Sequence, residues 1–147
     1  MYRRLALSGS LIALLLFVAV PVEADHMPSA TIYKHPQCGC CSGYADHLKA
    51  AGYHVKVKNT EDIDQVKQLL GIGPELESCH STVIGNYVIE GHVPLETVDR
   101  FLKEKPQLRG IALPGMPTGT PGMPGPRDEK LVIYTIEDQP KIWSVSE

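Results

Sequence analysis

The sequence contains no run of like charge, and this absence limits the partners the protein can have. The 147-residue chain carries 14 Lys+Arg and 17 Asp+Glu, for a formal net charge of −3. A mildly acidic protein without a basic patch is poorly suited to bind nucleic acid or an anionic membrane. We therefore expect neither of these as a partner.

The sequence also lacks an apolar run long enough to span a membrane. The longest apolar segment, residues 5–20, is interrupted by polar and small residues near its start. It falls short of the roughly 20 apolar residues that a spanning helix needs. Two arginines precede it, and a small-x-small cleavage pattern ends at Ala24. We predict a signal peptide over residues 1–24, cleaved after about Ala24, with an uncleaved anchor as the alternative.

No cysteine occurs at the predicted cleavage site, so a lipid anchor is not indicated. The remaining residues, 25–147, suffice for one domain with a hydrophobic core. We expect this domain in the periplasm, without stable membrane insertion once the signal peptide is removed. The exported compartment is oxidising, so disulfides are the default expectation for the four cysteines.

Apolar periodicity and turn residues predict an α/β domain. The predicted elements, in chain order, are a strand at 30–33, a helix from Ser42 to about Ala51, a strand at 54–58, a helix at 63–70, a hairpin of 82–84 and 87–89, and a helix from 94 to about 105. This order is typical of a thioredoxin-like or glutaredoxin-like domain, with a four-stranded mixed sheet and flanking helices.

The C-terminal part has a different composition. Residues 114–126 (PGMPTGTPGMPGP) contain five prolines, four glycines and two methionines, which excludes a helix or a central strand. A loop of this length in a compact domain is usually functional or disordered. Residues 131–145 alternate apolar and polar side chains around a polar turn, which predicts a C-terminal β-hairpin.

Three of the four cysteines lie within the stretch YKHPQCGCCSGYADHL, residues 33–48. Cys38 and Cys41 have C-x-x-C spacing between a predicted strand and a predicted helix. A helix N-terminus favours thiolates through its free N–H groups and its dipole. Because a thiolate both attacks disulfides and binds metals, this pair leaves a thiol–disulfide oxidoreductase and a metal site open. A structural disulfide is a third alternative, although so short a loop gains little stability from it.

The other two cysteines favour a metal site. Cys40 adds a third thiol, which invites mispairing in a dithiol enzyme but suits a soft ion, Cu(I), with Zn(II) as competitor. Threading the hairpin onto a glutaredoxin-type pattern puts His80 where that family has its cis-proline, and Cys79 just before it. Cys79 is therefore expected beside the C-x-x-C pair. Thiolates that bridge two or more Cu(I) ions would fit these adjacent side chains better than one tetrahedral ion.

Further candidate ligands are histidines and methionines. His35 precedes the first cysteine by three residues, and Met116 and Met123 lie in the Pro/Gly loop. A neutral thioether suits copper outside the cytosol. Each has a structural alternative: turn chemistry for His35, and packing of the loop against the core for the two methionines.

The remaining histidines near these motifs have structural interpretations as well. His80 is either a ligand or a packed core residue. His92, which follows the predicted hairpin, is interpreted as a turn residue, and His47 as a solvated residue of the first helix.

The combination of YKHPQCGCCSGYADHL, SCHSTVIGNYVIEGHVP and the loop LPGMPTGTPGM resembles the CopG-like family of exported bacterial copper-resistance proteins. The resemblance covers about residues 30–145. It implies a thioredoxin-like fold and copper bound through cysteines, which correspond here to Cys38, Cys40, Cys41 and Cys79. It also implies Cu(I)/Cu(II) interconversion as an associated activity, and other periplasmic copper-resistance proteins or an efflux system as partners.

We therefore predict a single thioredoxin-like metal-binding domain over residues 25–147, acting in copper resistance or homeostasis through bound Cu(I). The predicted metal ligands are Cys38, Cys40, Cys41, Cys79, His80, His35, Met116 and Met123. The alternative is a periplasmic thiol–disulfide oxidoreductase that uses Cys38 and Cys41. The residues leave open whether the protein is a copper oxidoreductase or a carrier without turnover.

Overall fold

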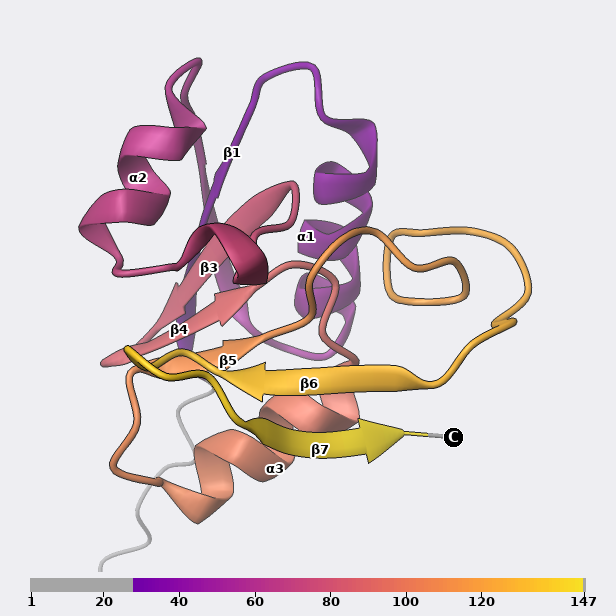
Figure 1. Cartoon of the computed structure of the whole chain (residues 1–147). Helices are drawn as coiled ribbons and strands as arrows, with labels where there is room; N and C mark the ends of the chain where they lie inside the picture. Colours follow the sequence, from indigo (N-terminus) through magenta and orange to yellow (C-terminus); the bar gives the residue numbers. More distant parts are fainter. Residues whose placement is uncertain (1–27, 147) are drawn as a thin grey trace, which may run out of the picture.

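The computed structural model describes residues 28–146, which form a seven-stranded mixed sheet with three α-helices (Figure 1). The helices are α1 (Gly39–Ala50), α2 (Ile63–Leu69) and α3 (Leu95–Glu104), with a 3₁₀ turn, η1 (Pro74–Leu76). The strands are β1 (Ser29–Lys34), β2 (His54–Asn59), β3 (His80–Ile84), β4 (Tyr87–Glu90), β5 (Gly110–Ala112), β6 (Leu131–Thr135) and β7 (Ile142–Ser146). The predicted signal peptide lies outside the described residues.

The strand order is β2-β1-β3-β4-β5-β6-β7. Strand β1 pairs in parallel with β2 and antiparallel with β3, and β4 pairs in parallel with β5. The sheet is therefore larger than the four-stranded sheet that we predicted. Strand β5 is three residues long, too short to show alternation, and the predicted C-terminal hairpin, β6–β7, continues the same sheet through β5.

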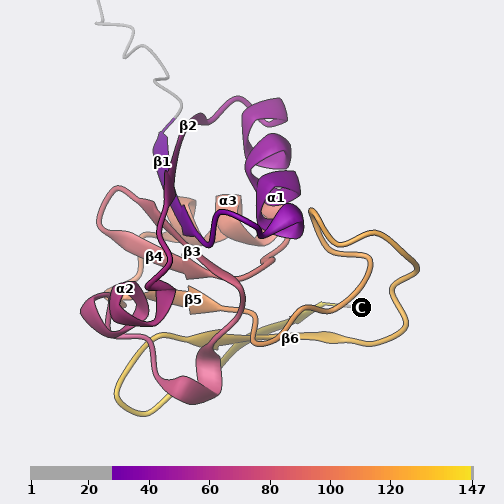
Figure 2. The same cartoon turned by 90° about the horizontal axis from the view of Figure 1, so that it is seen from above.

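The helices cover both faces of the sheet (Figures 1 and 2). Helices α1 and α3 share the larger hydrophobic core, in which Tyr44, Leu48 and Phe101 are fully buried against the central strands. A smaller core around Leu76 and Ile136 lies on the side of α2 and η1. Within residues 28–146, every helix is too short or too polar to cross a bilayer.

One end of the sheet collects the segments that carry the cysteines. The register pairs Lys34 at the end of β1 with His80 at the start of β3, and the end of β4 with the end of β5 through Glu90 and Ala112. The C-x-x-C loop, the Cys79 segment and the loop after β5 therefore leave the sheet at the same end. Hydrogen bonding across strands, and not sequence proximity, brings them together.

Candidate metal centre

Helix α1 begins earlier than the sequence suggested. Cys38 is its N-cap, with extended backbone and no side-chain capping bond, and the helix runs from Gly39. Ser42, at which we predicted the helix to begin, lies inside the first turn, and its hydroxyl donates to the Cys38 carbonyl at 3.4 Å. The backbone N–H of Cys38 donates to the His35 carbonyl at 3.0 Å. This turn already directs the chain into the helix, so Cys40 and Cys41 belong to its first turn.

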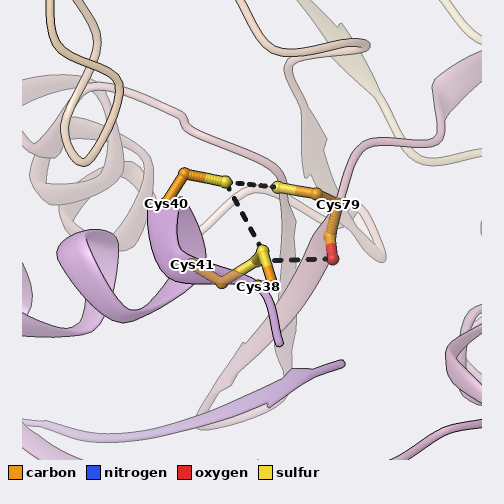
Figure 3. Close-up of side chains that lie close together, drawn as sticks. All are labelled: Cys38, Cys40, Cys41 and Cys79. Atoms are coloured by element: carbon orange, nitrogen blue, oxygen red, sulfur yellow. Dashed lines mark hydrogen bonds between the residues drawn. A yellow bond between two sulfur atoms is a disulfide. The ribbon is translucent and has the colours of Figure 1, made fainter. Parts of the chain in front are cut away.

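The four cysteines lie together (Figure 3). Cys38 and Cys41 form a disulfide, and Cys40 and Cys79 are free thiols. The Cys40 sulfur lies 3.4 Å from that of Cys38 and 3.7 Å from that of Cys79. All four sulfurs lie within 4.8 Å of one another, a grouping that could hold a metal ion. The expectation that Cys79 would lie beside the C-x-x-C pair is confirmed.

The disulfide defines the redox state of this arrangement. A disulfide sulfur carries no thiolate charge and is a weak metal donor, so Cys38 and Cys41 become thiolate ligands only after a two-electron reduction. In the oxidised state, Cys40 and Cys79 are the remaining thiols of the cluster. Reduction of the disulfide would therefore raise the number of available thiols from two to four.

Buried hydrogen bonds fix the Cys79 segment to the sheet. The backbone N–H of Ser78 and the hydroxyl of Ser81 donate to the Glu90 carboxylate, at 2.7 and 2.5 Å. Glu90 also pairs with the ammonium of Lys67 on α2, and both side chains are almost completely buried. Cys79 is thus held between two residues that share one acceptor, which restricts where its sulfur can point.

Burial keeps the Cys79 side chain protonated when no metal is present. Loss of solvation, followed by the nearby Cys40, raises the pKa of the Cys79 thiol to about 12. A bound metal ion would displace this proton, because coordination deprotonates a thiol outright. Metal binding here would therefore release a proton.

Two buried histidines contact the same sulfur. His92 Nε2 lies 3.0 Å and His80 Nδ1 lies 3.4 Å from the Cys79 sulfur, and Cys79, His80 and His92 form a second group that could hold an ion. Tyr44 packs against both rings and donates its hydroxyl to the Val93 carbonyl at 3.0 Å. Burial lowers the pKa of both histidines, for His80 with a further contribution from His92. Both imidazoles are therefore neutral at neutral pH, and each has a lone pair available.

The sequence interpretation of His92 as a turn residue missed this contact. The two-residue turn Gly85-Asn86 sets the hairpin register, which pairs Ser81 with Glu90. Two further steps along both strands bring Cys79 opposite His92. The bond from the Gly91 N–H to the His80 carbonyl, at 3.0 Å, continues the ladder to that point. The predicted hairpin thus contained the signal that could have identified His92.

The Pro/Gly loop folds back over the first turn of α1. The Pro121 carbonyl accepts a hydrogen bond from His92 Nδ1 at 2.7 Å. Gly122 has a φ of +82°, and a Cβ atom there would lie 2.5 Å from the Cys40 carbonyl oxygen, so only glycine fits this approach. The loop has its own hydrogen bonds, including one from the Thr120 hydroxyl to the Pro117 carbonyl at 2.7 Å. Pro121 and Gly122 of this loop therefore line the candidate metal centre.

The remaining predicted ligands lie as follows. His35 Nδ1 accepts a hydrogen bond from the Gln37 N–H at 3.3 Å, which is the turn chemistry considered as its alternative. It belongs to neither group of potential metal donors found among residues 28–146. Met123 is half-buried, whereas Met116 is 53% exposed. A ligand role for these three residues stays a prediction.

Comparison with known proteins adds a family to this geometry. No curated protein matches the sequence. A family profile described as "Protein of unknown function, DUF411" matches residues 76–123, which include Cys79, both buried histidines and the loop up to Met123. Two solved structures of a copper resistance protein, CopG, match about four fifths of the chain. Form 2 has 32% identity and a TM-score of 0.75, and the match covers 82% of this chain and 99% of that one. Form 1 has 33% identity and a TM-score of 0.73, with 80% and 96% covered.

The fold and the sulfur cluster define an α/β protein whose clustered cysteines could bind a metal ion. At 32% and 33% sequence identity over 82% and 80% of this chain, the similarity to the CopG structures is one of sequence as well as of fold. This chain belongs to the CopG-like family of copper-resistance proteins.

Proposed function

We propose that this protein is a periplasmic copper-binding protein in copper resistance or homeostasis, which holds Cu(I) through its clustered cysteine thiolates. The observation that carries the proposal is the position of Cys79. It follows Cys41 by 38 residues, yet its sulfur is 3.7 Å from that of Cys40 and joins the other sulfurs within 4.8 Å. A chain that used only a C-x-x-C dithiol would have no need of this fourth sulfur.

The donor set supports copper in its reduced state. Once the Cys38–Cys41 disulfide is reduced, the cluster would offer four thiolates, and soft thiolates select Cu(I) over harder divalent ions. Three of the four come from one short segment, Cys38 to Cys41, so bridging thiolates and a cluster of more than one ion fit better than a single tetrahedral ion. The family relationship to a copper resistance protein supports the same metal.

Interconversion of Cu(I) and Cu(II) forms part of the proposal, because the Cys38–Cys41 pair can exchange two electrons: as the disulfide of this structure it would accept them from two Cu(I) ions together with two protons, and as the reduced dithiol it would donate them. Oxidation of the Cys38 and Cys41 thiols to their disulfide releases two electrons and two protons. Those two electrons would reduce two Cu(II) ions to Cu(I), while Cys40 and Cys79 stay reduced. Other periplasmic copper-resistance proteins or an efflux system are the proposed recipients of the ions.

An anaerobic titration of the fully reduced protein with Cu(I), against a chromophoric Cu(I) chelator, tests the proposal. We expect Cys79→Ser to lower the copper stoichiometry as strongly as Cys38→Ser, because both remove a sulfur from one cluster. His54→Ala, on the exposed edge strand β2, is the control that should bind as the wild type does. An unchanged stoichiometry in Cys79→Ser would show that the fourth sulfur is not a ligand.

The disulfide between Cys38 and Cys41 favours a second candidate function, a thiol–disulfide oxidoreductase. Reduction of insulin by catalytic amounts of protein separates the two. An oxidoreductase would turn over and would keep its activity in Cys79→Ser, because that enzyme needs the C-x-x-C pair alone. Under the copper proposal, we expect no turnover above that of a free dithiol.

A further inference from the structure

Two lysines are buried in this fold, and they differ in what neutralises them. Lys67 is 2% exposed and pairs with the buried carboxylate of Glu90. Lys34, at the end of β1, is 4% exposed, yet within residues 28–146 its ammonium forms no ion pair. Lysines are almost never fully buried unless they are paired, because an unpaired charge is costly to remove from water. The burial of Lys34 therefore points to an anion that the disulfide form of the protein does not carry.

The ammonium of Lys34 lies against the loop that leads to the first cysteine. Its Nζ donates to the carbonyls of His35 and Pro36, at 2.9 and 3.3 Å. The His35 carbonyl oxygen also accepts the N–H of Cys38 at 3.0 Å. Because the contacts of 2.9 and 3.0 Å meet at this one oxygen, Nζ is less than about 6 Å from the Cys38 nitrogen. The charge is therefore next to the start of the C-x-x-C segment.

The sheet register places Lys34 on the face that carries the sulfurs. Lys34 pairs with His80 between β1 and β3, and directly opposite residues of antiparallel strands have their side chains on the same face. The His80 ring packs against Tyr44 of α1, so the Lys34 side chain also leaves the sheet on the α1 side. Cys79 directly precedes His80 in the chain. Both segments that supply sulfurs are thus neighbours of Lys34.

We propose that Lys34 is the counter-charge of the reduced sulfur cluster, a positioning residue that makes the Cys38–Cys41 disulfide easier to reduce. Reduction breaks the S–S bond, takes up two electrons and leaves two sulfurs, each negative until a proton or a metal ion binds it. A disulfide is neutral, so a fixed ammonium stabilises the reduced form selectively. The inference rests on the proposed function only for the copper-bound state, in which four thiolates that bridge two or three Cu(I) ions keep a negative charge.

A purely structural role for Lys34, as a clamp on the loop before Cys38, makes a different prediction. Such a clamp would stabilise the oxidised and the reduced protein alike. The midpoint potential depends only on the free-energy difference between these two forms, so loss of a clamp would leave the potential unchanged. Loss of a counter-charge would lower it. The potential therefore separates the two roles, which a measurement of stability alone would not do.

The test measures the midpoint potential of the Cys38–Cys41 couple in the metal-free protein. The protein is equilibrated with mixtures of reduced and oxidised dithiothreitol, and mass spectrometry of the alkylated peptides gives the fraction of disulfide. We expect Lys34→Met to shift the equilibrium toward the disulfide by about tenfold or more, which corresponds to a potential lower by about 30 mV. Lys34→Arg keeps the charge and should stay close to the wild type. Lys58→Met, at an exposed lysine of β2, is the matched control and should not shift it.

An unchanged potential in folded Lys34→Met overturns the inference, as does an equal shift in Lys58→Met, which would reflect the net charge of the protein. If Lys34→Met fails to fold, as judged by circular dichroism, Lys34→Gln takes its place. This substitution keeps an N–H donor for the loop and removes the charge, so the same shift is expected and its absence overturns the inference. The proposed function fails separately: the wild-type protein would then take up no Cu(I) in the anaerobic titration, whatever the potentials are.

Discussion

The buried pair of Glu90 and Lys67 makes a quantitative prediction about how the Cys79 segment is held. Glu90 is 0% and Lys67 2% exposed, and the carboxylate also accepts from Ser78 and Ser81. Glu90→Gln keeps the shape and one acceptor oxygen for the Ser78 N–H, reverses the Ser81 bond so that the hydroxyl accepts from the amide, and leaves the ammonium without a counter-ion. Removing one partner of a buried pair costs about 3–5 kcal/mol of unfolding free energy, and we expect a loss of this size.

The double variant Lys67→Met/Glu90→Gln separates charge from packing. Replacing both members of a buried pair by groups of similar volume is often close to neutral. We therefore expect the double variant to recover most of the stability lost in Glu90→Gln. The matched control is Glu104→Gln, which disrupts an exposed pair with Arg100 at 3.7 Å. Exposed pairs contribute about 0–1 kcal/mol.

Urea unfolding measured by circular dichroism gives these free energies, provided that the slope with denaturant is unchanged between variants. The reasoning is refuted if Glu90→Gln loses less than about 1 kcal/mol, or if the double variant is no more stable than Glu90→Gln. Either result would mean that the pair is not desolvated as its burial indicates. The Cu(I) affinity of the recovered double variant then reports whether the charge itself, and not only stability, orients Cys79.

The loop and the histidines allow two further predictions. Gly122→Ala should weaken Cu(I) binding, because the new Cβ would lie 2.5 Å from the Cys40 carbonyl oxygen. Gly115→Ala is the control: the residue has a similar φ of +73° and open space around the Cβ, so this substitution should leave Cu(I) binding unchanged. Equal effects of the two substitutions in the chelator competition assay would assign the change to backbone strain alone. The unfolding free energy of the metal-free protein should fall as the pH drops below about 6.5, because burial lowers the pKa of His80 and His92 in the folded state only. Denaturation curves between neutral and acid pH measure this; a slope unchanged in a His80→Phe variant would remove His80 as its source.

Local patterns predicted most of the elements, but not how the sheet extends. Helix α3 and the β3–β4 hairpin follow from spacing and turn residues. Strand β5 carries only three residues, and its position depends on Gly110, where a Cβ would overlap the Val88 carbonyl oxygen. That strand links the C-terminal hairpin to the sheet. Pairing between distant strands is set by packing, which a local pattern does not contain.

The candidate site, like the fold, was predicted from the sequence only in part. The grouping of the four cysteines was predictable, because a strand-to-helix loop and a hairpin have known relative positions in this kind of fold. The Lys67–Glu90 pair was not predicted, because charged residues on otherwise apolar faces carry no signal of their partner. C-x-x-C spacing likewise does not determine the oxidation state, since the same two residues serve as a disulfide or as two ligands.

The hairpin register connects these observations. The turn at Gly85-Asn86 sets Cys79 opposite His92, and two residues inward it sets Ser81 opposite Glu90. The same ladder therefore provides both the imidazole beside the sulfur and the carboxylate that anchors its segment. A one-residue slip would exchange the two faces of the strand and separate both pairs at once. The arrangement around Cys79 is thus a property of the backbone pairing and exists before any ion binds. An ion bound there would remove the thiol proton of Cys79 without having to bring the two imidazoles to it.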